Sequence, residues 1–135
     1  MRPARTIAVA IAAALVVAAL LARSPSPAAP AGDAKLAAAR VEAAAAVLEQ
    51  VKALSASGRD TTESVYTWSV RLLTAQLDAG AKPAAALGDH RQRMKELETA
   101  AKTRFDSGLA PKSELLATGY YQAEAELWGA RKKMR

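Results

Sequence analysis

Cysteine is absent from this chain of 135 residues, and histidine occurs only once. The lack of cysteine excludes disulfides, thiolate nucleophiles and cysteine-ligated metal sites. No group of Asp and Glu residues at ligand spacing accompanies the single histidine, so we expect no metal site. Aromatic residues are also scarce, with one Phe, two Trp and three Tyr, so a core must be built mainly from aliphatic side chains.

Alanine is instead abundant and accounts for 35 residues. It favours the helix more than any other residue and buries little surface. The composition therefore predicts a helical protein with a thin core, in which helices approach one another closely. Small cores often need oligomerisation to reach useful stability, so a homo-oligomer is one expectation.

The chain between its two basic ends is nearly neutral, without an excess of either charge. The net charge is +6, but three arginines flank an N-terminal apolar run, and four Lys and Arg residues lie between 131 and 135. The residues between these ends carry 12 basic and 13 acidic side chains. A nucleic-acid-binding domain usually has a basic face through its body, so we expect no nucleic-acid binding.

Residues 1–23 have the pattern of an export signal. Arg2 and Arg5 precede an uncharged run of 17 residues from Thr6 to Ala22. As a helix this run spans about 25 Å, slightly less than a bilayer core. No ideal cleavage site follows, so a signal peptide and an uncleaved N-terminal membrane anchor are both open. Either one predicts an exported protein of the periplasm or cell envelope, held in the inner membrane if the leader is uncleaved.

Residues 24–33 are rich in proline and alanine, which predicts an extended linker. From 34 to 135 the apolar residues recur three and four positions apart, and this spacing predicts four helices. Three of the stripes are Val41, Ala44, Leu48 and Val51; Val65, Trp68, Leu72 and Ala75; and Leu87, His90, Met94, Leu97 and Ala101. The fourth stripe has the spacing of a coiled-coil seam: Leu116, Tyr120, Ala123, Leu127 and Ala130.

Two glycines that are fifty residues apart, Gly58 and Gly108, each follow one helical stretch and precede another. Residues of similar type align when the two glycines are superposed. Residues of about 36–80 and 86–130 therefore form a weak internal repeat, in which each unit is a helical hairpin.

A third turn is indicated by Gly80 and Pro83, which suit the end of one helix and the start of the next. Short turns make neighbouring helices antiparallel. The predicted fold is therefore all-α, with two antiparallel coiled-coil hairpins in an up-down-up-down order. The pattern does not decide whether the hairpins close into a compact bundle or lie open for a partner.

Around Gly108 the sequence resembles the TolC-like outer-membrane efflux proteins. Their hairpins carry an aromatic residue, a glycine, a short polar run and an acidic residue with an apolar pair, here Phe105-Asp106-Ser107-Gly108-Leu109-Ala110-Pro111-Lys112-Ser113-Glu114-Leu115-Leu116. The turn at Gly58 fits more loosely, because Ser55 replaces the aromatic residue. The resemblance implies that the turns contact an adaptor protein. It covers the helical hairpins alone, without the membrane strands of the family, and the helices are shorter, so the chain is not a complete efflux channel.

No residue pattern points to catalysis. His90 lies on an inward stripe and is expected to be a hydrogen-bonded core residue. Ser69 and Ser113 lie on helices without a nucleophile elbow, and we expect them at caps or on the surface. Glu124 and Glu126 are two residues apart, so they face different directions and are expected on a solvated face. These features predict a non-enzymatic protein without a cofactor.

Partner docking is assigned to the turns and to aromatic residues of the last helix. The turns match the hairpin tips of the similar family. Two adjacent tyrosines cannot both face inward, so one of them could join a tryptophan on an exposed docking surface. The candidate docking residues are Gly58, Gly108, Leu109, Tyr120 and Trp128.

These expectations favour a non-enzymatic, exported coiled-coil protein that acts in protein–protein interaction or scaffolding in the cell envelope. A first alternative is an efflux-associated component that docks to an adaptor or channel through the turns at Gly58 and Gly108. A second alternative is a ligand-binding or enzymatic helical bundle, for which the sequence offers no recognisable site.

Overall fold

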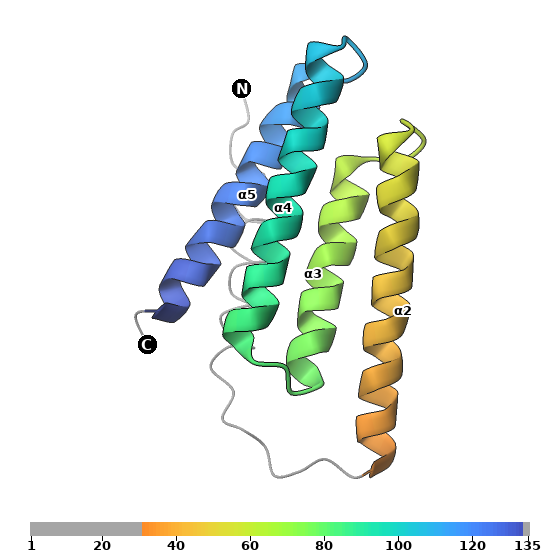
Figure 1. The fold of residues 1–135 in the computed structure, drawn as a ribbon, viewed down its shortest axis with the longest axis vertical. Helices are drawn as coiled ribbons and strands as arrows, with labels where there is room; N and C mark the ends of the chain where they lie inside the picture. Colours follow the sequence, from red (N-terminus) through yellow and green to blue (C-terminus); the bar gives the residue numbers. More distant parts are fainter. Residues whose placement is uncertain (1–30, 134–135) are drawn as a thin grey trace, which may run out of the picture.

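The computed structural model describes residues 31–133, which form four α-helices joined by three turns (Figure 1). The helices are α2 (Ala31–Ala56), α3 (Thr62–Asp78), α4 (Pro83–Asp106) and α5 (Lys112–Lys133). No strand occurs in this part of the chain, and the predicted all-α fold class is confirmed. The predicted leader lies outside the described residues. None of the described helices combines the length and the apolarity that a membrane crossing requires.

All three turns are built on a glycine with left-handed backbone. Gly58, Gly80 and Gly108 have φ angles of 74°, 87° and 71°, which residues with a Cβ rarely adopt. In each turn the glycine N–H donates to the carbonyl three residues back, and the next N–H donates to the carbonyl five residues back. These bonds measure between 2.8 and 3.0 Å and define a Schellman motif, which ends the helix and reverses the chain.

The two hairpins have the same boundaries when one is shifted by fifty residues. Helices α2 and α4 end at residues 56 and 106, and α3 and α5 begin at 62 and 112. The turn at Gly80 is different, because it leads directly into Pro83 at the first position of α4. The hairpin of α2 and α3 is called hairpin 1 below, and the hairpin of α4 and α5 is called hairpin 2.

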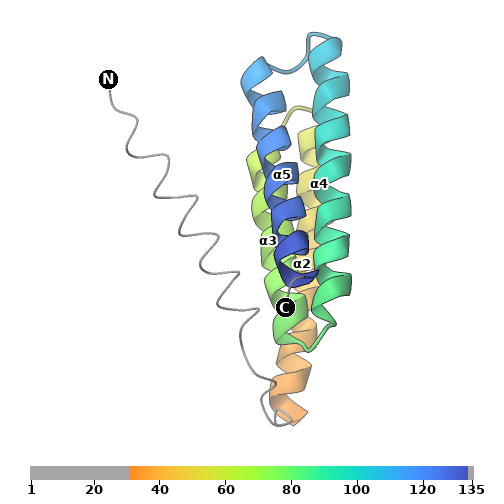
Figure 2. The same cartoon turned by 90° about the vertical axis from the view of Figure 1, so that its left-hand side faces the viewer.

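The four helices lie side by side in chain order, with α2 and α5 at opposite edges (Figure 1). The closest packing is within each hairpin, and α3 joins the hairpins mainly through α4. In the view turned by 90°, α3 and α5 lie toward one side and α2 and α4 toward the other (Figure 2). The arrangement is therefore an open row of helices, in which the two edge helices do not close the bundle.

The core consists of two clusters of aliphatic side chains. The larger cluster draws on every helix and contains Ala44, Leu48, Val51, Val65, Leu72, Met94, Leu97 and Ala125. The smaller cluster joins α3 to hairpin 2 and contains Leu73, Ala86, Leu87 and Trp128, with Val70 and Leu77 packed against it. Three of the four apolar stripes predicted from the sequence lie in these clusters or against them.

The fourth predicted stripe faces away from the core. Leu116, Tyr120 and Leu127 are 63%, 49% and 48% exposed, and Ala123 and Ala130 also lie on this side of α5. The opposite side of α5 is buried and carries Thr118, Glu124, Ala125 and Trp128. The spacing showed correctly that the five stripe residues share one side of a helix. It did not show which side meets the core, because α5 has apolar residues on both sides.

Candidate functional site

The outward side of α5 is the first candidate site, and its five residues are called the α5 stripe below: Leu116, Tyr120, Ala123, Leu127 and Ala130. The structure leaves six large hydrophobic residues of the described chain exposed, and three of them belong to this stripe. The five stripe residues are spaced three and four apart and run along about 21 Å of one helix side. A straight apolar stripe of this length suits another helix, since helices recognise one another through such seams.

Tyr120 is held at the margin of the stripe by a buried carboxylate. Its hydroxyl donates to Oε2 of Glu124 at 3.2 Å, and the hydroxyl of Tyr66 in α3 donates to Oε1 of the same residue. Burial raises the pKa of both Tyr66 and Tyr120, and the nearby Glu124 carboxylate raises it further, so both phenols remain donors. Glu124 is buried, and its predicted place on a solvated face is wrong. The sequence did not predict the hydrogen bond between Tyr66 and Glu124, because the two residues are 58 positions apart in the chain.

A second polar group lies buried between α3 and α4. Ser69 Oγ is 2.8 Å from Nδ1 of His90, and Nε of Arg93 donates to the same Ser69 oxygen at 2.7 Å. Burial, followed by the charge of Arg93, lowers the pKa of His90 to about 3. The imidazole is therefore neutral, and its Nδ1 shares a hydrogen bond with the Ser69 hydroxyl. The ring also stacks on Trp128, with centroids 5.5 Å apart.

This group has the residues of a serine–histidine pair but not the accessibility of a catalytic one. Neither Ser69 nor His90 exposes any surface, so a substrate carbonyl has no access to the hydroxyl. The prediction that His90 is a hydrogen-bonded core residue is confirmed. The prediction that Ser69 lies at a cap or on the surface is wrong, because it joins two helices. Trp128 is also buried, so it forms part of the core and not of an exposed docking surface.

The turns at Gly58 and Gly108 lie at the same end of the molecule, called the tip end below (Figure 1). Leu109 is 71% exposed there. Arg104 lies between the turns: its Nη1 donates to Oε1 of Glu114 at 2.7 Å, and its Nη2 is 3.4 Å from the carbonyl of Leu109. A Cβ added at Gly58 would lie 3.6 Å from the same Nη2. Three of the predicted docking residues therefore lie at the tip end, with the Arg104 guanidinium close to Gly58 and to the carbonyl of Leu109.

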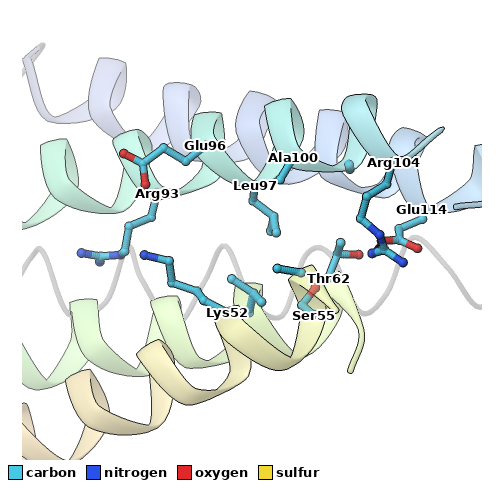
Figure 3. Close-up of a pocket in the computed structure, with 12 residues that line it drawn as sticks. Lys52, Ser55, Thr62, Arg93, Glu96, Leu97, Ala100, Arg104 and Glu114 are labelled. Carbon is cyan, nitrogen blue, oxygen red and sulfur yellow. Dashed lines mark hydrogen bonds and ion pairs between the residues drawn. The ribbon is translucent and has the colours of Figure 1, made fainter. Parts of the chain in front are cut away.

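A cleft of about 230 Å³ lies between the hairpins beside the tip end (Figure 3). Its walls are mostly apolar, from Val65, Leu97, Ala100 and Ala101, and the half-buried Arg104–Glu114 ion pair borders it. The cleft has room for a small apolar group but presents no acid and base aimed at one point. Residues 31–133 also hold no group of three or more metal-ligating side chains.

No known family, curated protein or solved structure matches this chain. Function must therefore be argued from the geometry of these surfaces. Two signals in the sequence could have found the polar groups. Arg93 follows His90 by three residues and Glu124 follows Tyr120 by four, so the two members of each pair are neighbours on the surface of their helix.

Proposed function

We propose that this protein is a non-enzymatic interaction module of the cell envelope, exported by means of residues 1–23, and that it binds a helical polypeptide on the α5 stripe. The observation that carries this proposal is an apolar stripe with coiled-coil spacing on the side of α5 that faces away from the protein's own core. Exposed and contiguous apolar surface of this kind is typical of interaction sites.

The energetics indicate how large the partner must be. Burying the exposed half of a Leu or Tyr side chain contributes about 1 kcal/mol, so the three large stripe residues together contribute about 3 kcal/mol. Association costs at least about 4 kcal/mol in lost translational and rotational freedom. A single short helix on the stripe would therefore bind weakly. A stable partner must cover neighbouring surface as well.

A second candidate function is docking of an adaptor or channel protein on the tip end, as in an efflux assembly. It is favoured by the exposure of Leu109 and by the placement of the turns at Gly58 and Gly108 at one end of the molecule. The two functions use different surfaces, because the stripe residues are exposed along the length of α5, whereas the turns lie at the tip end (Figure 1).

Site-specific photo-crosslinking separates these functions. A photoreactive amino acid is placed in the full-length chain at Leu127 for the stripe, at Leu109 for the tip end, or at exposed Lys95 of α4 as a control. The chain is then irradiated in the cells that produce it. We expect a protein adduct at Leu127 that is absent at Lys95. An adduct at Leu109 alone would favour tip docking, and adducts no stronger than the control at both positions would overturn both proposals.

A further inference from the structure

The internal repeat relates the exposed α5 stripe to a stripe on α3 that is covered. Counting back fifty residues from Leu116, Tyr120, Ala123 and Leu127 gives Tyr66, Val70, Leu73 and Leu77. Hairpin 2 covers these α3 positions: Leu73 clusters with Ala86, Leu87 and Trp128, and Val70 and Leu77 pack against that cluster. Tyr66 stacks on Tyr121 of α5, with centroids 4.1 Å apart.

The repeat also extends to contacts inside each hairpin. In hairpin 2, His90 of α4 stacks on Trp128 of α5 at 5.5 Å. The residues fifty positions earlier, Arg40 of α2 and Asp78 of α3, form an ion pair at 2.7 Å. The chemistry of the two contacts differs, but the same positions meet in both hairpins. Together with the matching helix ends, this contact makes α2 equivalent to α4 and α3 equivalent to α5.

Hairpin 2 therefore presents the surface that hairpin 1 buries, and within residues 31–133 no third hairpin covers it. We propose that hairpin 1 of a second copy of this chain covers the α5 stripe, packed as hairpin 2 packs on α3 within one copy. The contact is heterologous, since α5 of one copy meets α2 and α3 of the next. This inference rests on the proposed function, because it names the partner of the same stripe.

Side-chain volume at the junction supports this pairing. Within the chain, Leu73 and Ala86 belong to one cluster, so a large residue on α3 faces a small one on α4. At the proposed junction the equivalent positions are Ala123 on α5 and Leu36 on α2, so the small residue now lies on α5 and the large one on α2. The summed volume of the two side chains is the same as in the pair Leu73 and Ala86. Leu36 is 71% exposed on α2. The pairing therefore gives a partner to Leu36, a large exposed residue at the α2 edge of the row.

Charge and contact area are also compatible with this pairing. The α5 stripe carries no charged residue. On the facing hairpin Arg40 already pairs with Asp78, and Arg71, the equivalent of Tyr121, lies over the ring of Trp68. An unpaired buried charge would cost several kcal/mol, and these stripe residues and this ion pair introduce none. Covering the stripe with two helices of the next copy also supplies the additional contact area that a single helix would lack.

The absence of cysteine permits a direct test by disulfide formation between copies. Two full-length variants with different tags, Leu36→Cys and Ala123→Cys, are mixed and oxidised. A disulfide requires Cβ atoms about 4 Å apart, so its formation reports closely on the proposed contact. We expect the mixed 36–123 dimer to form at least about tenfold faster than a 36–95 dimer made with the exposed control Lys95→Cys.

Two results of this experiment would overturn the inference. A 123–123 dimer that forms as fast as the mixed dimer would indicate symmetric pairing of two α5 helices. Equal rates for the mixed dimer and the 36–95 control would indicate random collision. A failure of either kind leaves the proposed function standing if the photo-crosslinker at Leu127 still captures a different protein.

Solution mass gives a second and independent readout. We expect light scattering of the full-length chain to show a concentration-dependent assembly. The double variant Leu116→Glu and Leu127→Glu should have the mass of the single chain, with unchanged helical circular dichroism, because both positions are exposed within one copy. A wild-type chain that stays monomeric at all concentrations would contradict the inference.

Discussion

Ser69, His90 and Arg93 join α3 to α4 through hydrogen bonds in a place where most of the core is aliphatic. The hydrogen bonds pair the Ser69 hydroxyl with Nδ1 of His90 and Nε of Arg93, and they fix the position of one helix along the other. Because His90 is deeply buried and lies beside the cation of Arg93, its lowered pKa strongly favours the neutral form in the folded protein. Folding is therefore coupled to pH through one side chain.

We expect acid to weaken the fold through His90. The folded pKa of about 3 lies below the unfolded value near 6.5, so the unfolded chain binds the proton first as the pH falls. His90 has no effect above about pH 7, and below pH 6.5 it lowers the free energy of unfolding by up to about 1.4 kcal/mol per pH unit. Urea unfolding at pH 7, 6 and 5 measures this slope.

The matched variant is His90→Asn, whose side-chain amide can take the place of the Nδ1 atom beside Ser69 and does not titrate. Between pH 7 and pH 5, wild type should lose about 2 kcal/mol more than this variant. If both proteins lose the same free energy, His90 is not the group that responds to acid.

At the scale of the helix and its turns, the same capping motif occurs three times in the described residues. Each helix before a turn ends in a Schellman motif whose glycine has positive φ. Two of these turns lie at the tip end and include candidate docking residues, so their shape determines how Leu109 and the turn backbone are presented. The same glycines therefore serve both the stability of the hairpins and the geometry of the tip end.

Alanine substitution should distinguish turn glycines from helical ones. Gly58→Ala and Gly108→Ala should each lower the free energy of unfolding by about 1 kcal/mol, because alanine is strained at positive φ. Gly88 lies within α4 and a Cβ there meets no atom within 4 Å. Gly88→Ala should therefore raise stability by roughly 0.5 to 1 kcal/mol, as measured by urea midpoints. Equal effects at Gly88 and Gly108 would contradict the assigned turn geometry.

The helices and turns were predictable from the sequence because their signals are local. Glycine, proline and the three-four spacing act within a few residues, and they located the turns at Gly58, Gly80 and Gly108. Which side of a helix is buried depends instead on its packing against the other helices. The predicted stripes of α2, α3 and α4 lie in or against the core clusters, whereas α5 has apolar residues on two sides, and its core side includes the polar Thr118. The side of α5 with the three-four spacing was therefore wrongly predicted to be the buried side.

The candidate site was predictable only in part, for the same reason. Leu109 and Tyr120 are exposed as expected, because an end turn and one of two adjacent tyrosines must reach the surface. Trp128 was misplaced, since its burial depends on His90 and Leu73 from two other helices. These contacts join residues far apart in the chain, so spacing within one helix could not have revealed them.

At the scale of the whole molecule, equivalent positions of the two hairpins have opposite surroundings. Leu77 of α3 packs against the cluster formed with hairpin 2, whereas the equivalent stripe residue Leu127 lies on the open side of α5. The thin, alanine-rich core makes each large buried side chain important to folding. The exposed stripe, by contrast, contributes little to the stability of a single copy.

This contrast predicts different costs for two leucine truncations. Leu73→Ala should lower the free energy of unfolding by about 2 to 5 kcal/mol, because it leaves a cavity in a packed cluster. Leu127→Ala should change it by less than about 0.5 kcal/mol. Both are measured by urea unfolding at low protein concentration, where self-association adds no stability. A large cost for Leu127→Ala under these conditions would place the stripe in the core of the single chain.

The three turns of the chain make the two ends of the molecule different from each other. Ala31 and the C-terminal end of α5 lie at the end that holds the Gly80 turn, opposite the turns at Gly58 and Gly108 (Figure 1). The two ends are about 35 Å apart along a helix the length of α4. An attachment point beside Ala31 would therefore lie at the other end of the molecule from the tips. A partner on the α5 stripe would approach from the side of the helices, and a partner on the tips from their far end.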